Sequence, residues 1–145
     1  MKKVLLALLF IAAITTTLIA CRPTGPQIQI SNAWGRPSPM VAGNGAAYML
    51  IENMGGESDR LINASSEISE AVEIHDMTME DDVMKMFQID GLDIPARGSV
   101  ELKPGGKHIM FISIYNKLEI GQVITIVLEF EKSGEIIVEA EIHEP

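Results

Sequence analysis

Cysteine is almost absent from this sequence, which contains a single one, Cys21, in 145 residues. One cysteine cannot form an intramolecular disulfide, and it cannot supply the paired thiolates of a zinc site or a redox motif. The chain also offers no Ser-His-Asp arrangement, no zinc site with three histidines and no glycine-rich phosphate loop. We therefore expect no enzymatic activity.

Positive charge is scarce as well, with 11 Lys and Arg against 20 Asp and Glu and a formal net charge of −9. Residues 1–20 contain two lysines and no acidic residue, so removing them changes the formal charge from −9 to −11. An acidic surface repels nucleic acid and anionic lipid head groups. We expect no nucleic-acid partner and a surface that favours cations and basic protein patches.

The first 20 residues have the layout of an export signal, with Lys2 and Lys3 followed by an apolar run. This run is also near the lower length limit of a membrane-spanning helix, roughly 17 to 25 residues. The stretch LIAC at residues 18–21 resembles the lipobox of bacterial lipoproteins, whose cysteine is acylated. We predict a lipoprotein signal peptide over 1–20, a lipidated tether over 21–27 that begins at Cys21, and one domain over 28–145. The only membrane attachment is then a lipid anchor outside the cytoplasmic membrane.

From residue 28 onward apolar residues recur with a period near two, in runs broken by Gly, Pro, Asn, Asp and Ser. This pattern is typical of β-strands, and no stretch has a convincing helical period. The sequence predicts nine strands that pack as two antiparallel sheets. Their ranges are 28–34, 46–52, 60–64, 71–79, 83–89, 99–102, 108–114, 123–131 and 136–142.

Histidine and methionine are concentrated in two short segments, HDMTMEDDVMKM at 75–86 and HIM at 108–110. If the first segment is a hairpin closed by Asp81 and Asp82, strand alternation puts its methionines and His75 on one face. Met86 then lies opposite Met77, and a slip of one residue would scatter the cluster. On a third strand, His108 and Met110 are two residues apart and share a face.

Packing is the competing explanation, because a methionine considered singly is usually core filler. We assign Met40, Met49, Met54 and His143 to packing or to ordinary polar contacts. The cluster differs, since Asp76 and Thr78 occupy the opposite side of the same strand and the hairpin tip should project beyond the sandwich. Neutral thioethers with imidazoles suit Cu(I), whereas Zn²⁺ prefers thiolates and Mg²⁺ or Ca²⁺ prefers oxygen. Met77, Met79 and Met84 remain open between ligands, spare ligands and a hydrophobic surround.

The spacing His75, ten residues, Met86, twenty-one residues, His108, one residue, Met110 resembles the motif of the PCuAC family of periplasmic copper chaperones. The segments AAYMLIEN, VMKM and IPARGSVELKPGGKHIM also resemble that family's strands and turns. The resemblance implies a cupredoxin-like or Ig-like β-sandwich that binds one Cu(I) through His75, Met86, His108 and Met110. It also implies delivery of copper for the dinuclear centre of cytochrome c oxidase, with the oxidase subunit or a thioredoxin-like copper chaperone as partner. We expect a monomer.

Three other functions compete with that of a copper chaperone. An electron-transfer cupredoxin needs a Cys thiolate beside two histidines, and Cys21 lies in the lipobox-like stretch. A copper-storage or copper-resistance protein of the envelope would use the same ligands. A structural β-sandwich lipoprotein without metal would leave the motif unexplained. The chain ends at Glu144 and Pro145 without the His- and Met-rich tail that holds a second, Cu(II) site in some members of the family it resembles, so we expect no strong second metal site.

Overall fold

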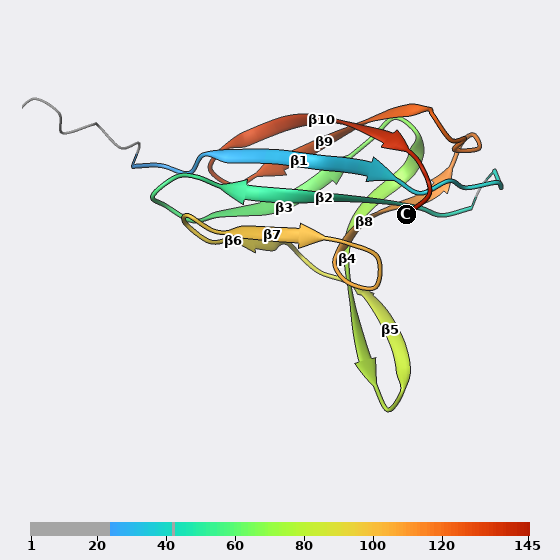
Figure 1. Cartoon of the computed structure of the whole chain (residues 1–145), viewed down its shortest axis with the longest axis horizontal. Coiled ribbons are helices and arrows are strands. Elements are labelled where there is room, and N and C mark those ends of the chain that lie inside the picture. Colours follow the sequence, from blue (N-terminus) through green and yellow to red (C-terminus); the bar gives the residue numbers. More distant parts are fainter. Residues whose placement is uncertain (1–23, 42) are drawn as a thin grey trace, which may run out of the picture.

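The computed structural model describes residues 24–41 and 43–145, and these residues form ten strands and no helix (Figure 1). None of this part of the chain forms a helix long and apolar enough to cross a membrane. The predicted signal peptide over 1–20 and the predicted lipidation site Cys21 lie outside the described residues.

The ten strands follow one another with short connections. They are β1 (Ile28–Gly35), β2 (Gly45–Asn53), β3 (Asp59–Ser65), β4 (Ser69–Glu80), β5 (Val83–Gln88), β6 (Leu92–Ile94), β7 (Ser99–Leu102), β8 (His108–Ile114), β9 (Val123–Phe130) and β10 (Gly134–Ile142).

Hydrogen bonds join the strands in the order β5-β4-β8-β2-β1-β10-β9-β3-β6, and β7 pairs with β2. The path folds over on itself, so that strands of both layers contribute to one hydrophobic core. β9 shows how the sequence produces this burial: Ile124, Ile126, Leu128 and Phe130 alternate with more exposed residues and are all at most 2% exposed. Burial of each such side chain contributes about 1.5–3 kcal/mol to folding.

The all-β class predicted from alternation is confirmed, and all nine predicted strands are present with ends within two residues of those expected. Two details differ. The sequence reasoning missed β6, because a strand of three residues is too short to show a period. The pairing of β1 with β10 is parallel, at Trp34 with Glu141 and Gly35 with Ile142, so the sheet is mixed and not wholly antiparallel.

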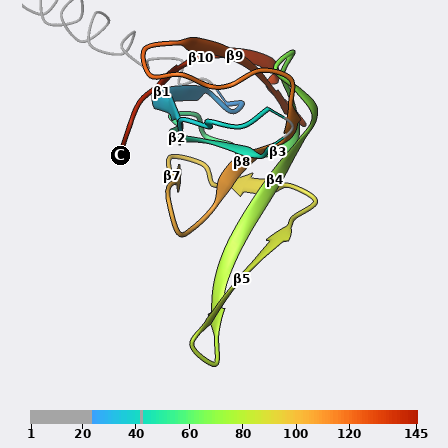
Figure 2. The same cartoon turned by 90° about the vertical axis from the view of Figure 1, so that its right-hand side faces the viewer.

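The β4–β5 hairpin projects from the sandwich as an arm (Figures 1 and 2). β4 has twelve residues, and its pairing with β8 ends at His75, so residues beyond it pair with β5 alone. All six residues of β5 are exposed. The projection expected from Asp76 and Thr78 is therefore what the structure has.

Methionines outside the arm divide into two groups. Met49 is 2% exposed and belongs to the core, as predicted. Met40 and Met54 are 66% and 60% exposed, so the expectation that they fill the core is wrong. Both lie in connections outside the strands, where alternation does not direct side chains inward.

Asp59 ties together the loops at one end of the sandwich. It is 4% exposed, and its carboxylate accepts hydrogen bonds from the backbone N–H groups of Arg60, Lys132 and Ser133 and from the Ser133 hydroxyl, at 2.6–3.0 Å. Burial by itself would raise the pKa of Asp59, but these hydrogen bonds outweigh it and hold the pKa below its usual value.

We expect Asp59→Asn to lower the free energy of unfolding at pH 7 by about 1–3 kcal/mol, because an amide N–H would face buried donors. Since the folded-state pKa is depressed, the carboxylate stabilises the fold above its unfolded pKa, which is near the ordinary aspartate value of 3.8. That contribution is lost as the pH falls through the lower, folded-state pKa. Urea unfolding at pH 7 and below pH 4 measures it. Asp93→Asn, at a side chain 78% exposed, is the control, and equal effects of both substitutions would contradict the prediction.

Candidate metal centre

The register of the arm is the one that the sequence predicts. β4 and β5 pair Met77 with Met86 and Met79 with Met84, and the two-residue connection consists of Asp81 and Asp82. Both aspartates have positive φ, 50° and 61°, the combination typical of a type I′ hairpin turn. Directly paired residues share a face, so all four methionines of the arm lie on one side.

His75 joins this face to the sandwich. It pairs with Gln88 of β5 along one edge of β4 and with His108 of β8 along the other. The two imidazole rings are 5.7 Å apart between centroids. His75 is 8% exposed and His108 is 5% exposed, so both rings are buried where the arm meets the sandwich.

An ion pair on the opposite face supports the same register. The ammonium of Lys107, which precedes His108, contacts the carboxylate of Asp76, which follows His75. Burial by itself would raise the pKa of Asp76, but the hydrogen bonds from Lys107 and from the Met77 N–H outweigh it and lower the pKa. Asp76 therefore stays ionised at neutral pH, and its ion pair with Lys107 stabilises the register of β4 and β8 beside the histidine pair.

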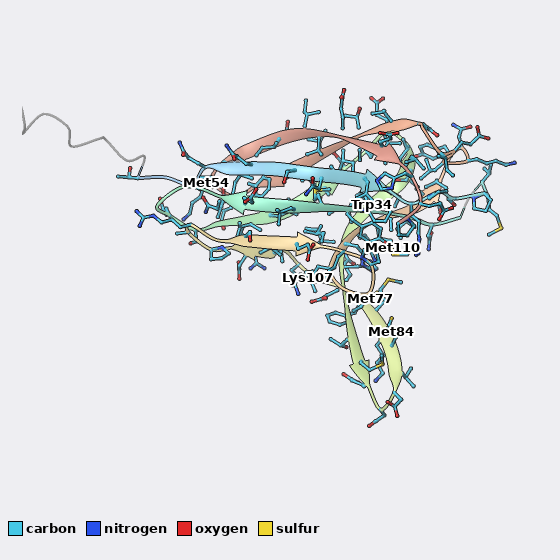
Figure 3. The ribbon with its side chains drawn as sticks, viewed as in Figure 1. Trp34, Met54, Met77, Met84, Lys107 and Met110 are labelled. Atoms are coloured by element: carbon cyan, nitrogen blue, oxygen red, sulfur yellow. The ribbon has the colours of Figure 1, made fainter. Side chains whose placement is uncertain are left out.

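Met110 is the fourth residue of the motif, and it lies between two strands. β8 pairs Met110 with Glu73 of β4 and with Ala46 of β2, which places it on the same face as His108. Figure 3 shows Met110 at the base of the arm, with Met77 and Met84 further along it.

A pocket of about 530 Å³ opens at this junction. Five of the seven residues that the sequence singles out line it: Met77, Met84, Met86, His108 and Met110. His75 does not line the pocket but lies beside His108. Met79 is also absent from the lining and is 63% exposed, nearer the tip of the arm.

Backbone geometry holds the His108 ring. The turn between β7 and β8 contains Gly105 at φ 78°, a left-handed conformation that glycine adopts without strain. The next carbonyl, of Gly106, lies 2.9 Å from Nδ1 of His108. A carbonyl only accepts, so Nδ1 carries the proton and Nε2 of His108 keeps its lone pair.

Two residues of the site were missed by the sequence reasoning. The first is Glu73, whose Oε2 lies 2.7 Å from Nε2 of His75. The other ring nitrogen of His75, Nδ1, is buried without a partner. Tyr48 lines the pocket with its ring centroid 6.3 Å from that of His108. The spacing of Glu73 and His75, two apart on a strand, was a usable signal for the first; nothing local marked the second.

Aromatic rings continue from Tyr48 toward the surface. Trp34 lies 4.6 Å from Tyr48 between centroids and stacks on His143 at 4.7 Å. Burial raises the pKa of Tyr48, an effect that the charge of Arg36 partly opposes. Trp34 is thus a packing residue at this end of the sandwich.

The donors on this face fit a soft cation. Two imidazoles and several thioethers are directed to one side of β4, β5 and β8, and a buried imidazole nitrogen there lacks a partner. Among the described residues, no group of three or more His, Cys, Asp or Glu side chains is arranged to hold a metal. Sulfur ligands are typical of Cu(I) sites.

A family model described as "Putative lipoprotein LpqE-like" matches residues 28–142. The chain is 31% identical over 106 residues to "Putative lipoprotein Lxx21020" of Leifsonia xyli subsp. xyli, with 71% of the chain and 61% of that protein covered. It is 29% identical over 124 residues to the uncharacterized protein RP573 of Rickettsia prowazekii, covering 83% of the chain and 68% of that protein. The chain thus spans less than two thirds of the Leifsonia relative.

Solved structures with this fold include PCuAC domains. The copper-bound PCuAC domain from PmoF2 superimposes with a TM-score of 0.67 at 26% identity, over 83% of the chain and 99% of that domain. The apo PCuAC domain from PmoF1 gives 0.68 at 23% identity, over 83% and 100%. The solution structure of Cu(I)-DR1885 from Deinococcus radiodurans gives 0.59 at 24% identity, over 85% of each chain.

The turn of the arm provides a test of its geometry. Replacing Asp81 and Asp82 by Asn and Gly removes part of the cost of the left-handed backbone, about 1 kcal/mol. We expect amide hydrogen exchange in the arm, at residues 77–87, to slow roughly fivefold, while exchange in β9 and β10 stays unchanged. Asp82→Ala is the matched variant, and it should speed exchange because alanine disfavours positive φ. Equal exchange rates in all three proteins would contradict the assigned turn.

Proposed function

The chain belongs to the LpqE-like family and resembles PCuAC domains in sequence motif and fold, and from this premise we propose that it is a copper(I) chaperone. In this proposal it holds one Cu(I) outside the cytoplasmic membrane through His75, Met86, His108 and Met110. It delivers the ion and carries out no turnover chemistry.

One observation carries the proposal: residues from three strands, distant in sequence, present imidazole and thioether groups on one face around one pocket. His75 lies directly across from His108, and Met86 lies across from Met77. Met86, His108 and Met110 line the same pocket. The copper-bound PCuAC domain from PmoF2 is 26% identical over 83% of the chain, which supports a metal of the same kind here.

The exposure of the ligands favours delivery over permanent retention. The two imidazoles are buried, whereas Met86 is 47% exposed and Met84 is 52% exposed on the arm. Thioethers need no deprotonation to bind Cu(I), and they bind it less strongly than thiolates do. An incoming thiolate can therefore reach the ion from the methionine side and replace neutral sulfur ligands.

The recipient in this proposal is the dinuclear copper centre of cytochrome c oxidase, reached directly or through a thioredoxin-like copper chaperone. Thiolate ligands of such a recipient would draw Cu(I) from the thioethers. The acidic chain favours recipients with a basic surface. The LIAC stretch and the family description of putative lipoproteins both support a location at the cell envelope, with Cys21 as the lipidated residue.

The first experiment is an anaerobic titration of the full chain in detergent with Cu(I) against a coloured chelator. We expect one tightly held ion per chain and a colourless complex. His75→Ala and Met86→Ala should each weaken binding by at least tenfold, because each removes a ligand. Met54→Ala is the matched control, since Met54 is 60% exposed and lies at the far end of the sandwich (Figure 3).

Each other outcome identifies a different function. Equal, weak Cu(I) binding by all four proteins would indicate a structural β-sandwich protein that binds no metal. Several ions per chain, lost when Met79 and Met84 are replaced, would favour copper storage or resistance. An intense blue Cu(II) form would indicate electron transfer, for which this chain has only Cys21 as a thiolate.

Transfer is the second test. When the Cu(I)-loaded chain is mixed with the reduced copper-binding domain of the oxidase subunit, we expect the copper to move to that domain. The two proteins are then separated and the copper content of each is measured. The reason is the preference of Cu(I) for thiolates over thioethers. Retention of copper by the chain at equal concentrations of both proteins would contradict a delivery role and leave only binding.

A further inference from the structure

His75 contains a buried nitrogen that nothing in the described part of the chain satisfies. Its Nδ1 is shielded from solvent and has no hydrogen-bond partner. The other ring nitrogen, Nε2, lies 2.7 Å from Oε2 of Glu73. A buried polar atom without a partner costs free energy, so its persistence indicates a role that the folded chain alone does not fulfil.

The contact with Glu73 decides which nitrogen of His75 carries the proton. A carboxylate oxygen accepts hydrogen bonds, so Nε2 is the donor and Glu73 is the acceptor. In the neutral imidazole the lone pair is then on Nδ1. The two nitrogens lie on opposite sides of the ring carbon between them, so the lone pair faces away from Glu73.

We infer that Glu73 is a positioning residue that makes Nδ1 the metal-binding nitrogen of His75. The inference rests on the proposed function, because it specifies how one proposed ligand meets Cu(I). A carboxylate that accepts a hydrogen bond from the nitrogen opposite the metal fixes the ring's tautomer and orientation and makes the ligand more basic. The free energy lost at the unpaired Nδ1 is recovered when the metal binds.

The same reasoning gives the other histidine the opposite assignment. Nδ1 of His108 donates to the carbonyl of Gly106, so His108 binds through Nε2. The two rings, 5.7 Å apart between centroids on directly paired residues, thus present different nitrogens. Of the two rings, only that of His75 is hydrogen-bonded to a charged side chain.

Glu73 itself is a poor candidate for a ligand. Carboxylate oxygen is a hard donor that suits Mg²⁺ or Ca²⁺, and Cu(I) prefers sulfur and imidazole. One of its oxygens is already engaged with His75. Its cross-strand neighbour is Met110, so the carboxylate lies on the face of the site without being needed in the ligand set.

The test uses ¹⁵N NMR of histidine rings in the full chain in detergent micelles, with and without Cu(I). Selective labelling gives a simple spectrum, because the chain has three histidines. In the metal-free protein we expect His75 to be protonated at Nε2 and unprotonated at Nδ1. On adding Cu(I) anaerobically, the Nδ1 resonance of His75 and the Nε2 resonance of His108 should shift.

Glu73→Ala should leave a mixture of His75 tautomers in the metal-free protein and weaken Cu(I) binding about 10- to 100-fold. Glu73→Gln keeps the size of the side chain, and its amide can accept or donate, so it should fall between the parent and Glu73→Ala. Glu70→Ala is the matched control, an exposed glutamate on the same strand, and it should change neither measurement.

Three results would overturn the inference. The first is a proton on Nδ1 of His75 in the metal-free protein, and the second is a larger Cu(I)-induced shift at Nε2 of His75 than at its Nδ1. The third is an unchanged tautomer in Glu73→Ala, because Glu73 would then not set the proton's position. A parent chain that binds no Cu(I) at all would instead refute the proposed function, and the metal-free spectrum would still show whether Glu73 holds the ring.

Discussion

The alternation of β4 and β8 is the constraint on which the site depends, because the core fixes it from the opposite side. Ile74 pairs with Ile109, and both are buried in the hydrophobic core. The adjacent pair in the same ladder, His75 and His108, must then lie on the other face. A slip of one residue in β4 would put the His75 imidazole into the core and Ile74 at the pocket, at a cost of several kcal/mol. Apolar burial thus positions the proposed ligands.

The site combines a rigid part and an adaptable part. His75 and His108 are buried, and each has one nitrogen held by a hydrogen bond, to Glu73 and to the Gly106 carbonyl. The methionines of the arm are partly exposed, and their side chains are long and unbranched. Such a division suits a protein that must hold an ion in a defined place and also release it.

The opposite end of the sandwich serves stability. There Asn53, which is 1% exposed, accepts hydrogen bonds from the Gln27 and Gly55 N–H groups and donates to the Glu57 carbonyl. The Asp59 carboxylate accepts hydrogen bonds from the β9–β10 turn in the same way. These buried polar residues satisfy loop backbone that would otherwise be unpaired. Tight loops at this end leave the other end free to carry an exposed arm.

Nine of the ten strands, the Asp81-Asp82 turn and the register that pairs Met77 with Met86 could be predicted from the sequence, because alternation and turn chemistry act over neighbouring residues. The spacing of His75, Met86, His108 and Met110, which resembles the PCuAC motif, also predicts these four residues as ligands. Two pairings follow from the tertiary fold instead: β4 pairs with β8, which places His75 across from His108, and β1 runs parallel to β10. The tertiary structure alone revealed the Glu73 contact and the place of Tyr48 beside the pocket. These features depend on which strand edges meet across long stretches of chain, and that choice is made by the burial of the whole core, which no local pattern records.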